Sequence, residues 1–290
     1  MESGADNIKP MHIAVLMATY NGIRYLREQI ESLLHQSYQD WTLYIHDDGS
    51  TDGTQDCIQD YANRYENIKV LTYAKTGNAK NNFFSMLQAI NAEYYMFCDQ
   101  DDVWLPEKIE ISVNKMRQKE AETPFLPIIV FSDLTVVDQS LHVIQDSFMK
   151  MSGIYPEHIN TFEEIAALPI VTGCTMLINK RVKEIVPFWN HTDIQMHDIW
   201  LTLCTLKYNG VLCFIDKPLI LYRQHGNNTI GAKDVKEITI SYRIKNAVKM
   251  WIINQNYYRM LQLLGYGSLA KFYWNKLKYK YRIKSSKQAN

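Results

Sequence analysis

The first hundred residues alternate between apolar runs and amphipathic segments, and this alternation restricts the fold more than any other feature. Apolar runs at residues 13–18, 41–46, 68–73 and 94–98 predict strands, and the segments at about 23–36, 54–65 and 81–91 predict helices. Strands that alternate with helices are typical of βαβ units and of a mostly parallel sheet. The sequence therefore predicts an α/β protein.

The rest of the chain is less regular. Strands are predicted at residues 128–131, 169–178 and 211–216, the second of them with a glycine break, and a helix at 197–208. From about residue 236 onward the pattern is helical and is broken by Gly265 and Gly267.

Polar loops follow three of the predicted strands. They are residues 19–22 (TYNG), 47–50 (DDGS) and 99–102 (DQDD). Because the carboxyl ends of parallel strands meet at one edge of a sheet, these loops are expected to form one ligand site. The chain lacks the G-x-G-x-x-G and G-x-x-x-x-G-K-[ST] patterns, which disfavours a dinucleotide-binding Rossmann protein and a P-loop NTPase.

The DQDD loop places three carboxylates within four residues. Their mutual repulsion is costly at neutral pH unless a cation joins them, although a solvated acidic turn is the simpler alternative. A calcium EF-hand is excluded, because Trp104 stands where that loop needs glycine. Mg²⁺ or Mn²⁺ shared with substrate phosphates fits better, since such ions keep few protein ligands.

Six motifs in a fixed order carry a family resemblance. ATYNG, DDGSTDGT, FCDQDDVWLPEK, GC, HD and YRQHGNN resemble the family 2 glycosyltransferases of GT-A fold, over about residues 12–230. DQDDVWLPEK and YRQHGNN resemble most the rhamnosyltransferase-like bacterial branch.

The resemblance implies a domain organisation. It comprises a tail at residues 1–11, a GT-A domain at 12–234 and a basic, aromatic helical extension at 235–290. The GT-A domain would be a Rossmann-like, mostly parallel mixed sheet flanked by helices. Its nucleotide-binding half would cover residues 12–103, and its acceptor half 104–234.

The resemblance also implies which residues bind the nucleotide. Asp47 and Asp48 would read the uracil or thymine and its ribose, although helix capping is the simpler interpretation of that loop. The other residues expected at the nucleotide are Thr19, Tyr20, Asn21, Lys80, Asn81 and Asp99.

By the same resemblance, Asp99 and Asp101 would hold Mg²⁺ or Mn²⁺ on the diphosphate. His225 would complete the metal shell, and Arg223 would contact the diphosphate. The alternative for His225 is a loop histidine with ordinary hydrogen bonds.

The donor sugar and the acceptor would lie against Asp102, Trp104, Gly173, Cys174 and His197, and the alternative for Asp102 is to support the metal ion. Asp198 matches the general base of the family, and its simpler interpretation is a helix N-cap. The implied reaction is inverting transfer of a sugar from dTDP-rhamnose or a UDP-hexose to a glycan or lipid-linked saccharide. The alternatives are a sugar-nucleotide pyrophosphorylase and a non-catalytic nucleotide-sugar-binding protein.

The net charge of zero conceals a strong asymmetry. Residues 238–290 carry eleven Lys or Arg and no Asp or Glu, so residues 1–237 carry the balancing −11. Aromatic residues are interleaved with this charge over residues 242–287. This predicts either helices that pack on the acidic body or an interfacial helix pair on an anionic membrane, whereas the acidic body disfavours nucleic acid.

The location expected from the sequence is the cytoplasm, or the inner face of the plasma membrane as a peripheral protein. The five cysteines form no C-x-x-C pair, and the first ten residues contain no apolar signal segment.

Overall fold

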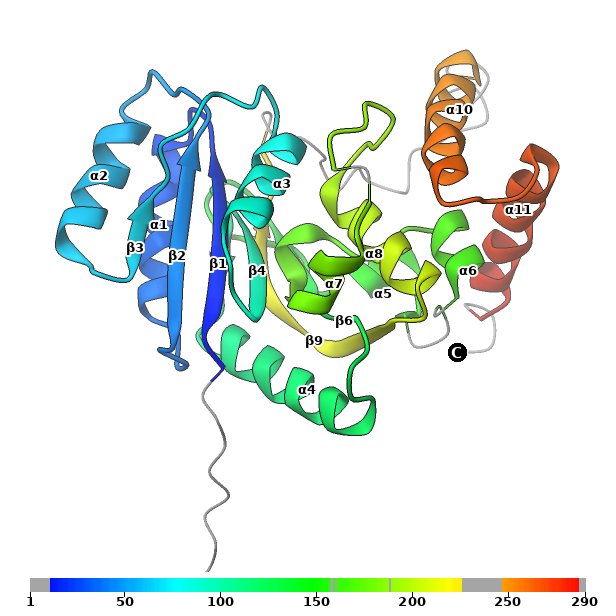
Figure 1. The fold of residues 1–290 in the computed structure, drawn as a ribbon, viewed down its shortest axis with the longest axis horizontal. Helices are drawn as coiled ribbons and strands as arrows, with labels where there is room; N and C mark the ends of the chain where they lie inside the picture. The colour runs from blue at the N-terminus through cyan, green and yellow to red at the C-terminus, as the bar shows by residue number, and fades with distance from the viewer. Residues whose placement is uncertain (1–10, 157–158, 160, 188, 226–246, 287–290) are drawn as a thin grey trace, which may run out of the picture.

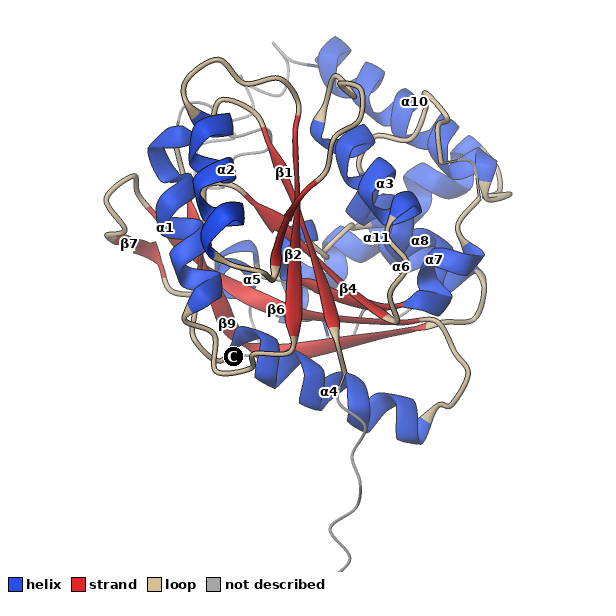
Figure 2. Ribbon diagram, turned by 60° about the vertical axis from the view of Figure 1, so that its left-hand side comes forward, coloured by secondary structure: helices blue, strands red, loops and turns tan. Residues whose placement is uncertain are grey.

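A central sheet is covered by helices on both faces (Figures 1 and 2). The computed structural model describes the chain except for residues 1–10, 157–158, 160, 188, 226–246 and 287–290. The sheet has nine strands within this described part, in the order β3-β2-β1-β4-β8-β6-β9-β5, and β7 pairs with β6.

The first four strands are parallel, as the alternation predicted. In register, Ala18 of β1 faces His46 of β2 and Asp99 of β4, so the strands end together. The strands are β1 (Ile13–Thr19), β2 (Trp41–Asp47), β3 (Ile68–Val70) and β4 (Tyr94–Asp99), connected by α1 (Ile23–Leu34), α2 (Thr54–Arg64) and α3 (Ala79–Ala89).

The second half makes the sheet mixed. β8 is antiparallel to β4 and β6, β9 is parallel to β6, and β5 is antiparallel to β9. The strands are β5 (Val103–Trp104), β6 (Ile128–Val137), β7 (Val143–Gln145), β8 (Met176–Asn179) and β9 (Val211–Arg223). The strand predicted at 169–178 is wrong in part, because a 3₁₀ turn, η2 (Gly173–Thr175), precedes the short β8.

Five further helices surround this half of the sheet. α4 runs beneath it in Figure 1, and α7 and α8 lie on the face that α3 also covers. They are α4 (Lys108–Glu122), α5 (Phe148–Ser152), α6 (Phe162–Ala167), α7 (Lys180–Ile185) and α8 (His197–Lys207).

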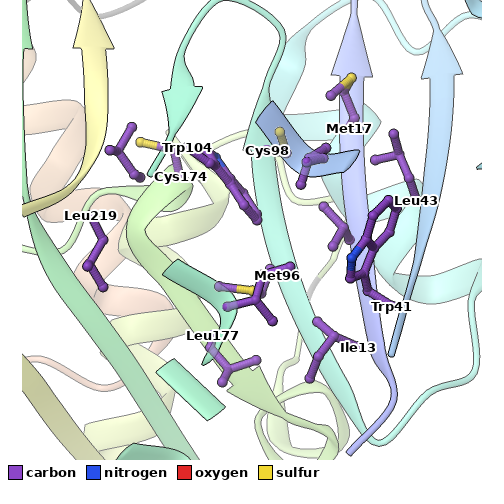
Figure 3. Close-up of a cluster of buried hydrophobic side chains, with 14 of the residues drawn as sticks. Ile13, Met17, Trp41, Leu43, Met96, Cys98, Trp104, Cys174, Leu177 and Leu219 are labelled. Carbon is purple, nitrogen blue, oxygen red and sulfur yellow. The ribbon is translucent and has the colours of Figure 1, made fainter. Parts of the chain in front are cut away.

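Alternate residues of β1 point into two separate cores. Ile13, Val15 and Met17 pack with residues of α1, α2 and α4, whereas Ala14 and Leu16 pack with residues of α3 and α8. This period of two explains why β1 is apolar throughout, since both of its faces are buried. Figure 3 shows the first of these cores.

The C-terminal helices, α10 (Ala247–Leu263) and α11 (Leu269–Ser286), meet at a break where Gly265 has φ of 69°. Their buried residues, including Met260 and Phe272, join the core on the α8 face. Lys271 of α11 also forms an ion pair with Glu163 of α6 at 3.2 Å. Packing on the body is thus confirmed for part of these helices. The predicted boundary at 234/235 lies outside the described residues, and within them no helix is both long and apolar enough to cross a bilayer.

Candidate active site

A cleft of about 1040 Å³ opens at the carboxyl edge of the sheet. All three predicted polar loops contribute to it, as do the start of α8 and the end of β9. The predicted site residues that line the cleft are Thr19, Tyr20, Asn21, Asp48, Asp99, Asp101, Gly173, His197, Asp198 and His225. These ten residues come from six segments of the chain, and those after β1, β2 and β4 meet because the parallel strands end at one edge.

Asp47 supports the loop that follows β2 and does not line the cleft. Its Oδ2 accepts the backbone N–H groups of Gly49 and Ser50 at 3.0 and 2.8 Å, and its Oδ1 accepts the Thr19 hydroxyl at 3.0 Å. Asp47 therefore does not cap a helix, since the N-cap of α2 is Gly53, but its hydrogen bonds to the next residues shape the loop.

Asp48 lines the cleft but is also hydrogen-bonded within the protein. Its Oδ2 accepts the N–H of Gly77 at 2.8 Å, and its Oδ1 accepts both the N–H and the hydroxyl of Thr76. Asp48 thereby fastens the segment before α3 to the end of β2.

The segment before α3 differs from the prediction in which residues face the cleft. Lys80 Nζ donates to the carbonyl of Ile194 at 2.9 Å, and Asn81 Nδ2 donates to the carbonyl of Thr76 at 3.1 Å. Neither lines the cleft, whereas Asn78 and Asn82 do. Asn81 is instead tied to the helix start, because Asn78 accepts its N–H as the N-cap of α3.

Asp99 lies where negative charge is most concentrated. Burial, followed by the charges of Asp101 and Asp198, raises the pKa of Asp99 to about 7 from 3.8, although the Cys174 thiol lowers it by hydrogen bonding. A carboxylate in this state is poised to gain from a nearby cation.

Asp101 is paired with the predicted histidine. Its Oδ2 lies 2.7 Å from His225 Nε2, and the imidazole stacks on Tyr25 with ring centroids 5.0 Å apart. Both side chains are mostly buried but line the cleft. The tertiary structure thus brings together three of the residues expected at the diphosphate, Asp99, Asp101 and His225.

Asp102 is fully buried, which corrects the expectation that it faces the sugar. Its Oδ1 accepts the backbone N–H of Arg223 at 3.1 Å, and burial and the charges of Asp101 and Asp99 raise its pKa. The buried Cys174 lies beside it rather than at the acceptor. Asp102 therefore links the DQDD loop to β9 behind the cleft.

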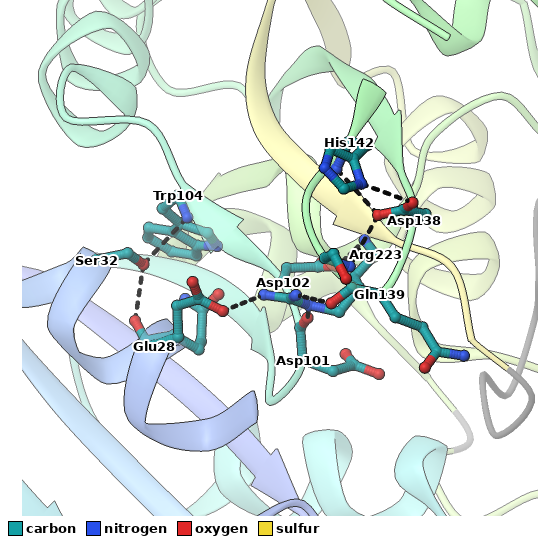
Figure 4. Close-up of polar contacts among 11 residues, drawn as sticks. Glu28, Ser32, Asp101, Asp102, Trp104, Asp138, Gln139, His142 and Arg223 are labelled. Carbon is teal, nitrogen blue, oxygen red and sulfur yellow. Dashed lines mark hydrogen bonds and ion pairs between the residues drawn. The ribbon is translucent and has the colours of Figure 1, made fainter. Parts of the chain in front are cut away.

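Arg223 is only 2% exposed, so it is not available as the predicted diphosphate ligand. Its guanidinium donates to the carbonyls of Asp101 and Gln139 at 2.8 and 2.6 Å and pairs with Glu28 (Figure 4). An arginine with this many donors satisfied by the protein serves to position the loop that carries Asp101.

Trp104 packs in the core, which corrects its predicted contact with the sugar (Figure 3). The Lys108 ammonium lies 4.4 Å from the Trp104 ring centroid and has no hydrogen-bond partner among the described residues. Burial lowers the pKa of Lys108 to about 8, and the neighbouring Cys174, Cys98 and Asp102 oppose that shift. Lys108 is thus a buried cationic group that lies near Asp102.

Asp198 lies in the first turn of α8, whose N-cap is Met196, so the N-cap interpretation is wrong. Its Oδ2 accepts the Gly173 N–H at 3.0 Å, and its Oδ1 accepts that of Ile199 at 2.7 Å. A Cβ at position 173 would come within 2.6 Å of His197 Nε2. The GC and HD motifs are therefore in contact, and the glycine allows this approach.

His197 is 3% exposed, lines the cleft, and packs against Phe83 and Phe97. Neither of its ring nitrogens has a hydrogen-bond partner among the described residues. Burial lowers its pKa, which favours the neutral ring. A neutral imidazole has one donor and one acceptor to offer a bound hydroxyl.

Several residues of the cleft were not predicted. Gln100, the second residue of DQDD, makes two hydrogen bonds to the backbone of Tyr20, accepting at 2.9 Å and donating at 3.0 Å. Its side chain also covers Gly22. Its place inside a recognised motif was the available signal, and Asn78 and Asn82 lie beside the predicted Lys80 and Asn81. Nothing local marked several others, among them Arg24, Tyr25, Lys75, Gln139 and Met196.

The donor set suits a hard divalent ion. Asp99 and Asp101 offer carboxylate oxygens and His225 an imidazole, all lining the cleft. A second cluster, Asp99, Asp102 and Cys174, has ligand atoms within 4.8 Å of one another. Burial raises the pKa of the Cys174 thiol, which therefore stays protonated and is a poor ligand for Mg²⁺ or Mn²⁺.

A mixed α/β sheet whose acidic strand ends border one cleft is the arrangement of the GT-A fold, and the comparisons agree. Residues 14–185 match the family model described as glycosyl transferase family 2. The match covers more than half of the chain, so the protein belongs to this family and is a glycosyltransferase. Family membership rules out the pyrophosphorylase alternative.

Two relatives match most of the chain. The dTDP-rhamnosyl transferase RfbG of Shigella flexneri is 29% identical over 259 residues, which are 84% of this chain and 81% of the relative. The putative teichuronic acid biosynthesis glycosyltransferase TuaG of Bacillus subtilis strain 168 is 26% identical over 255 residues, 88% and 91% of the two chains.

Solved structures share the fold. Staphylococcus aureus TarS 1–349 in complex with UDP matches with a TM-score of 0.58 at 15% identity, over 97% of this chain and 92% of that one. In a longer TarS structure the match spans 37% of that chain. The mannosyltransferase PcManGT of Pyrobaculum calidifontis, in complex with GDP-Man and Mn²⁺, also matches with a TM-score of 0.58. Its identity is 14%, over 96% of this chain and 76% of that one.

Proposed function

We propose that this glycosyltransferase moves a sugar from a nucleoside-diphosphate sugar to an acceptor hydroxyl with inversion at the anomeric carbon. The observation that carries the proposal is that carboxylates from two sides meet in one cleft. Asp99 ends β4 and Asp101 follows it, while Asp198 lies on α8 and is held by the Gly173 N–H. One group suits a diphosphate with its metal ion, and the other suits a reacting hydroxyl.

The donor we propose is dTDP-rhamnose or a UDP-hexose. The nucleotide would lie against residues 19–21 and Asp48, which line the cleft. The name of RfbG favours a dTDP-sugar, and the UDP bound to TarS makes a uridine nucleotide the second candidate.

Mg²⁺ or Mn²⁺ is the proposed cofactor, held by Asp99, Asp101 and His225. A divalent ion there would supply positive charge for the departing diphosphate. The crowded carboxylates and the raised pKa of Asp99 support this assignment, as does the Mn²⁺ bound to PcManGT. Arg223, Glu28 and Gln139 would hold the loop in place without touching the nucleotide.

Asp198 is the proposed general base. It would take the proton of the acceptor hydroxyl as that oxygen bonds to the anomeric carbon and the bond from this carbon to the phosphate oxygen breaks. The N–H groups of Gly173 and Ile199 keep the carboxylate oriented. His197 would hydrogen-bond a hydroxyl of the sugar or of the acceptor. Because the acceptor attacks opposite the leaving group, the configuration inverts.

The proposed acceptor is a glycan or a lipid-linked saccharide of a bacterial surface polysaccharide. The name of TuaG, which refers to teichuronic acid biosynthesis, supports this class. Nucleotide sugars and such carriers meet at the inner face of the plasma membrane, so we propose a cytoplasmic enzyme that works at that surface.

The test compares Asp198→Asn with the wild-type protein on a panel of dTDP- and UDP-sugars with Mn²⁺. We expect transfer to fall about 10²–10⁴-fold, the usual contribution of a general base. Nucleotide binding, measured by calorimetry with UDP or dTDP, should remain unchanged. If Asp198→Asn keeps full transfer activity, Asp198 is not the general base. A wild-type protein that binds the donor but never transfers the sugar would favour the non-catalytic alternative.

A further inference from the structure

We propose that the first turns of α10 form a membrane anchor that inserts into the interface of an anionic lipid bilayer. The inference deepens the proposed function, because it assumes that the acceptor is met at a membrane. It starts from a run of exposed apolar side chains, which we call the apolar collar: Val248, Met250, Trp251, Ile252 and Ile253, exposed by 72%, 50%, 58%, 47% and 45%.

The apolar collar surrounds the helix. Successive residues of an α-helix are about 100° apart, so the six positions 248–253 reach every side of it. Only Lys249 among them is polar, and all six are exposed. A helix that is apolar on every side needs an apolar environment on every side, which one flat protein surface does not offer.

The other end of α10 is fixed to the body. Tyr257, Met260 and Leu261 are buried in the core on the α8 face, and Lys276 of α11 donates to Asn254 at 2.6 Å. In Figure 1 the start of α10 points away from the sheet. The apolar collar is therefore carried on a fixed support and projects from it.

One face of α11 has a similar composition. Trp274 and Leu277 are 68% and 54% exposed, and Lys271 and Lys278 are also exposed at helical spacing from Trp274. Phe272 is buried on the other side. Tryptophan and leucine flanked by lysine are typical of helices that lie in a membrane interface.

Charge selects the type of lipid. Residues 238–290 contain eleven Lys or Arg and no acidic residue, so nothing in this segment repels an anionic surface. Cationic side chains next to an apolar insertion strengthen binding to anionic headgroups, and salt weakens that part. Because α10 and α11 do not have the length and apolarity of a spanning helix, the expected mode is interfacial.

The experiment is co-sedimentation of the full-length protein with vesicles of phosphatidylglycerol and phosphatidylcholine, or of phosphatidylcholine alone. The test variant is Trp251→Glu with Ile252→Glu. The control is Val143→Glu with Ile144→Glu, which changes two residues of β7 that are each 56% exposed. All four positions are exposed, so circular dichroism should show both proteins folded.

We expect the wild type and the control to bind anionic vesicles equally and more weakly at high salt, with weaker binding to phosphatidylcholine alone. The collar variant should bind roughly tenfold or more weakly, because two carboxylates replace inserted apolar groups. A wild type that ignores anionic vesicles, or a collar variant that binds as tightly as the control, would overturn the inference.

A second copy of the chain is the rival occupant, and light scattering without lipid identifies it. If the wild type is a dimer that does not bind vesicles, and the double variant Trp251→Glu with Ile252→Glu is a monomer, the apolar collar serves self-association and the inference is overturned. Binding of UDP or dTDP with Mn²⁺ is measured on the same samples. A wild type that binds neither nucleotide would contradict the proposed function, whereas a wild type that binds nucleotide but no anionic vesicles would contradict the anchor alone.

Discussion

Two acidic loops, at the ends of the strands β2 and β4 that flank β1, look alike in the sequence but differ in the folded protein. In DDGS, the carboxylates of Asp47 and Asp48 accept hydrogen bonds from the backbone N–H groups of Gly49, Ser50 and Gly77, among others. In DQDD, burial and mutual repulsion raise the pKa values of Asp99 and Asp102.

The difference separates a structural use of carboxylates from a functional one. Asp47 and Asp48 stabilise the loops that border the nucleotide end of the cleft, because backbone donors offset their charge. The DQDD carboxylates are crowded at a cost in stability, which is typical of a site prepared for a positively charged ligand. We therefore expect substitutions in the two loops to have opposite consequences.

The largest expected effect is on activity, from Asp101→Asn. Loss of this carboxylate should reduce transfer about 10³-fold, the range seen when charge stabilisation of a transition state is removed. Nucleoside diphosphate release with donor, acceptor and Mn²⁺ measures it, and a chelator should cause a similar loss in the wild type. Asp60→Asn, which alters an exposed carboxylate paired with Arg64 on α2, is the control. Full activity of Asp101→Asn would end the assignment of DQDD to the diphosphate.

The second effect is on stability, from Asp47→Asn. An amide carries no charge and presents NH₂ where Asp47 accepts the N–H groups of Gly49 and Ser50. We expect the free energy of unfolding to fall by about 1–3 kcal/mol. Urea denaturation measures it, again with Asp60→Asn for comparison. A variant as stable as the wild type would mean that the DDGS loop holds its shape without this carboxylate.

The third effect has the opposite sign, and Asp99→Asn should stabilise the metal-free protein at pH 8. Since the pKa of Asp99 rises to about 7 on folding, from 3.8, the native state retains a proton that the unfolded chain has lost between these values. Stability therefore falls as pH rises from about 4 to 7, and the substitution should remove that loss, roughly 1–3 kcal/mol.

Urea denaturation with chelator at pH 4 and pH 8 checks this prediction. The advantage of Asp99→Asn over the wild type should be small at pH 4 and full at pH 8. An equal gain in the free energy of unfolding at both pH values, or a variant that is less stable at pH 8, would show that the charged Asp99 carboxylate does not destabilise the folded protein.

The smallest expected effect concerns the hydrogen bonds between the DQDD loop and the loop after β1. Gln100→Ala removes both hydrogen bonds to the Tyr20 backbone, so the loop after β1 loses its fixed position. We expect the KM for the donor to rise about fivefold, equivalent to roughly 1 kcal/mol, with a smaller change in kcat. Gln100→Glu keeps the acceptor and loses the donor, and should be intermediate. A change in kcat alone would place Gln100 in the chemistry instead.

Much of the fold could be predicted because its signals are local. The strands that end at Thr19, Asp47 and Asp99 and the helices α1, α2 and α3 follow from apolar periodicity and loop composition, and the structure confirms them within a few residues. Helix α4, which follows the DQDD loop, was not predicted. The strand predicted at 169–178 was wrong in part, because an apolar run does not reveal that η2 turns the chain so that Gly173 can reach Asp198.

The site was predictable to the same extent. Parallel strands place their loops at one edge, so the loops that carry Asp48, Asp99 and Asp101 were expected to share a cleft, and the family resemblance added Asp198. Exposure could not be predicted in the same way. Trp104, Asp102 and Arg223 lie in or next to motifs and yet are buried, because β5 and β9 pair across more than a hundred residues of sequence.

The order of strands and helices and the chemistry of the loops are properties of short segments, and the sequence alone determined them. The tertiary structure decided which carboxylates face the cleft and which, like Asp102, are covered. It also decided that Lys108 lies buried on Trp104 and that the apolar collar of α10 remains uncovered. The reason is physical: periodicity depends on neighbours in the chain, whereas burial and pKa depend on neighbours in space.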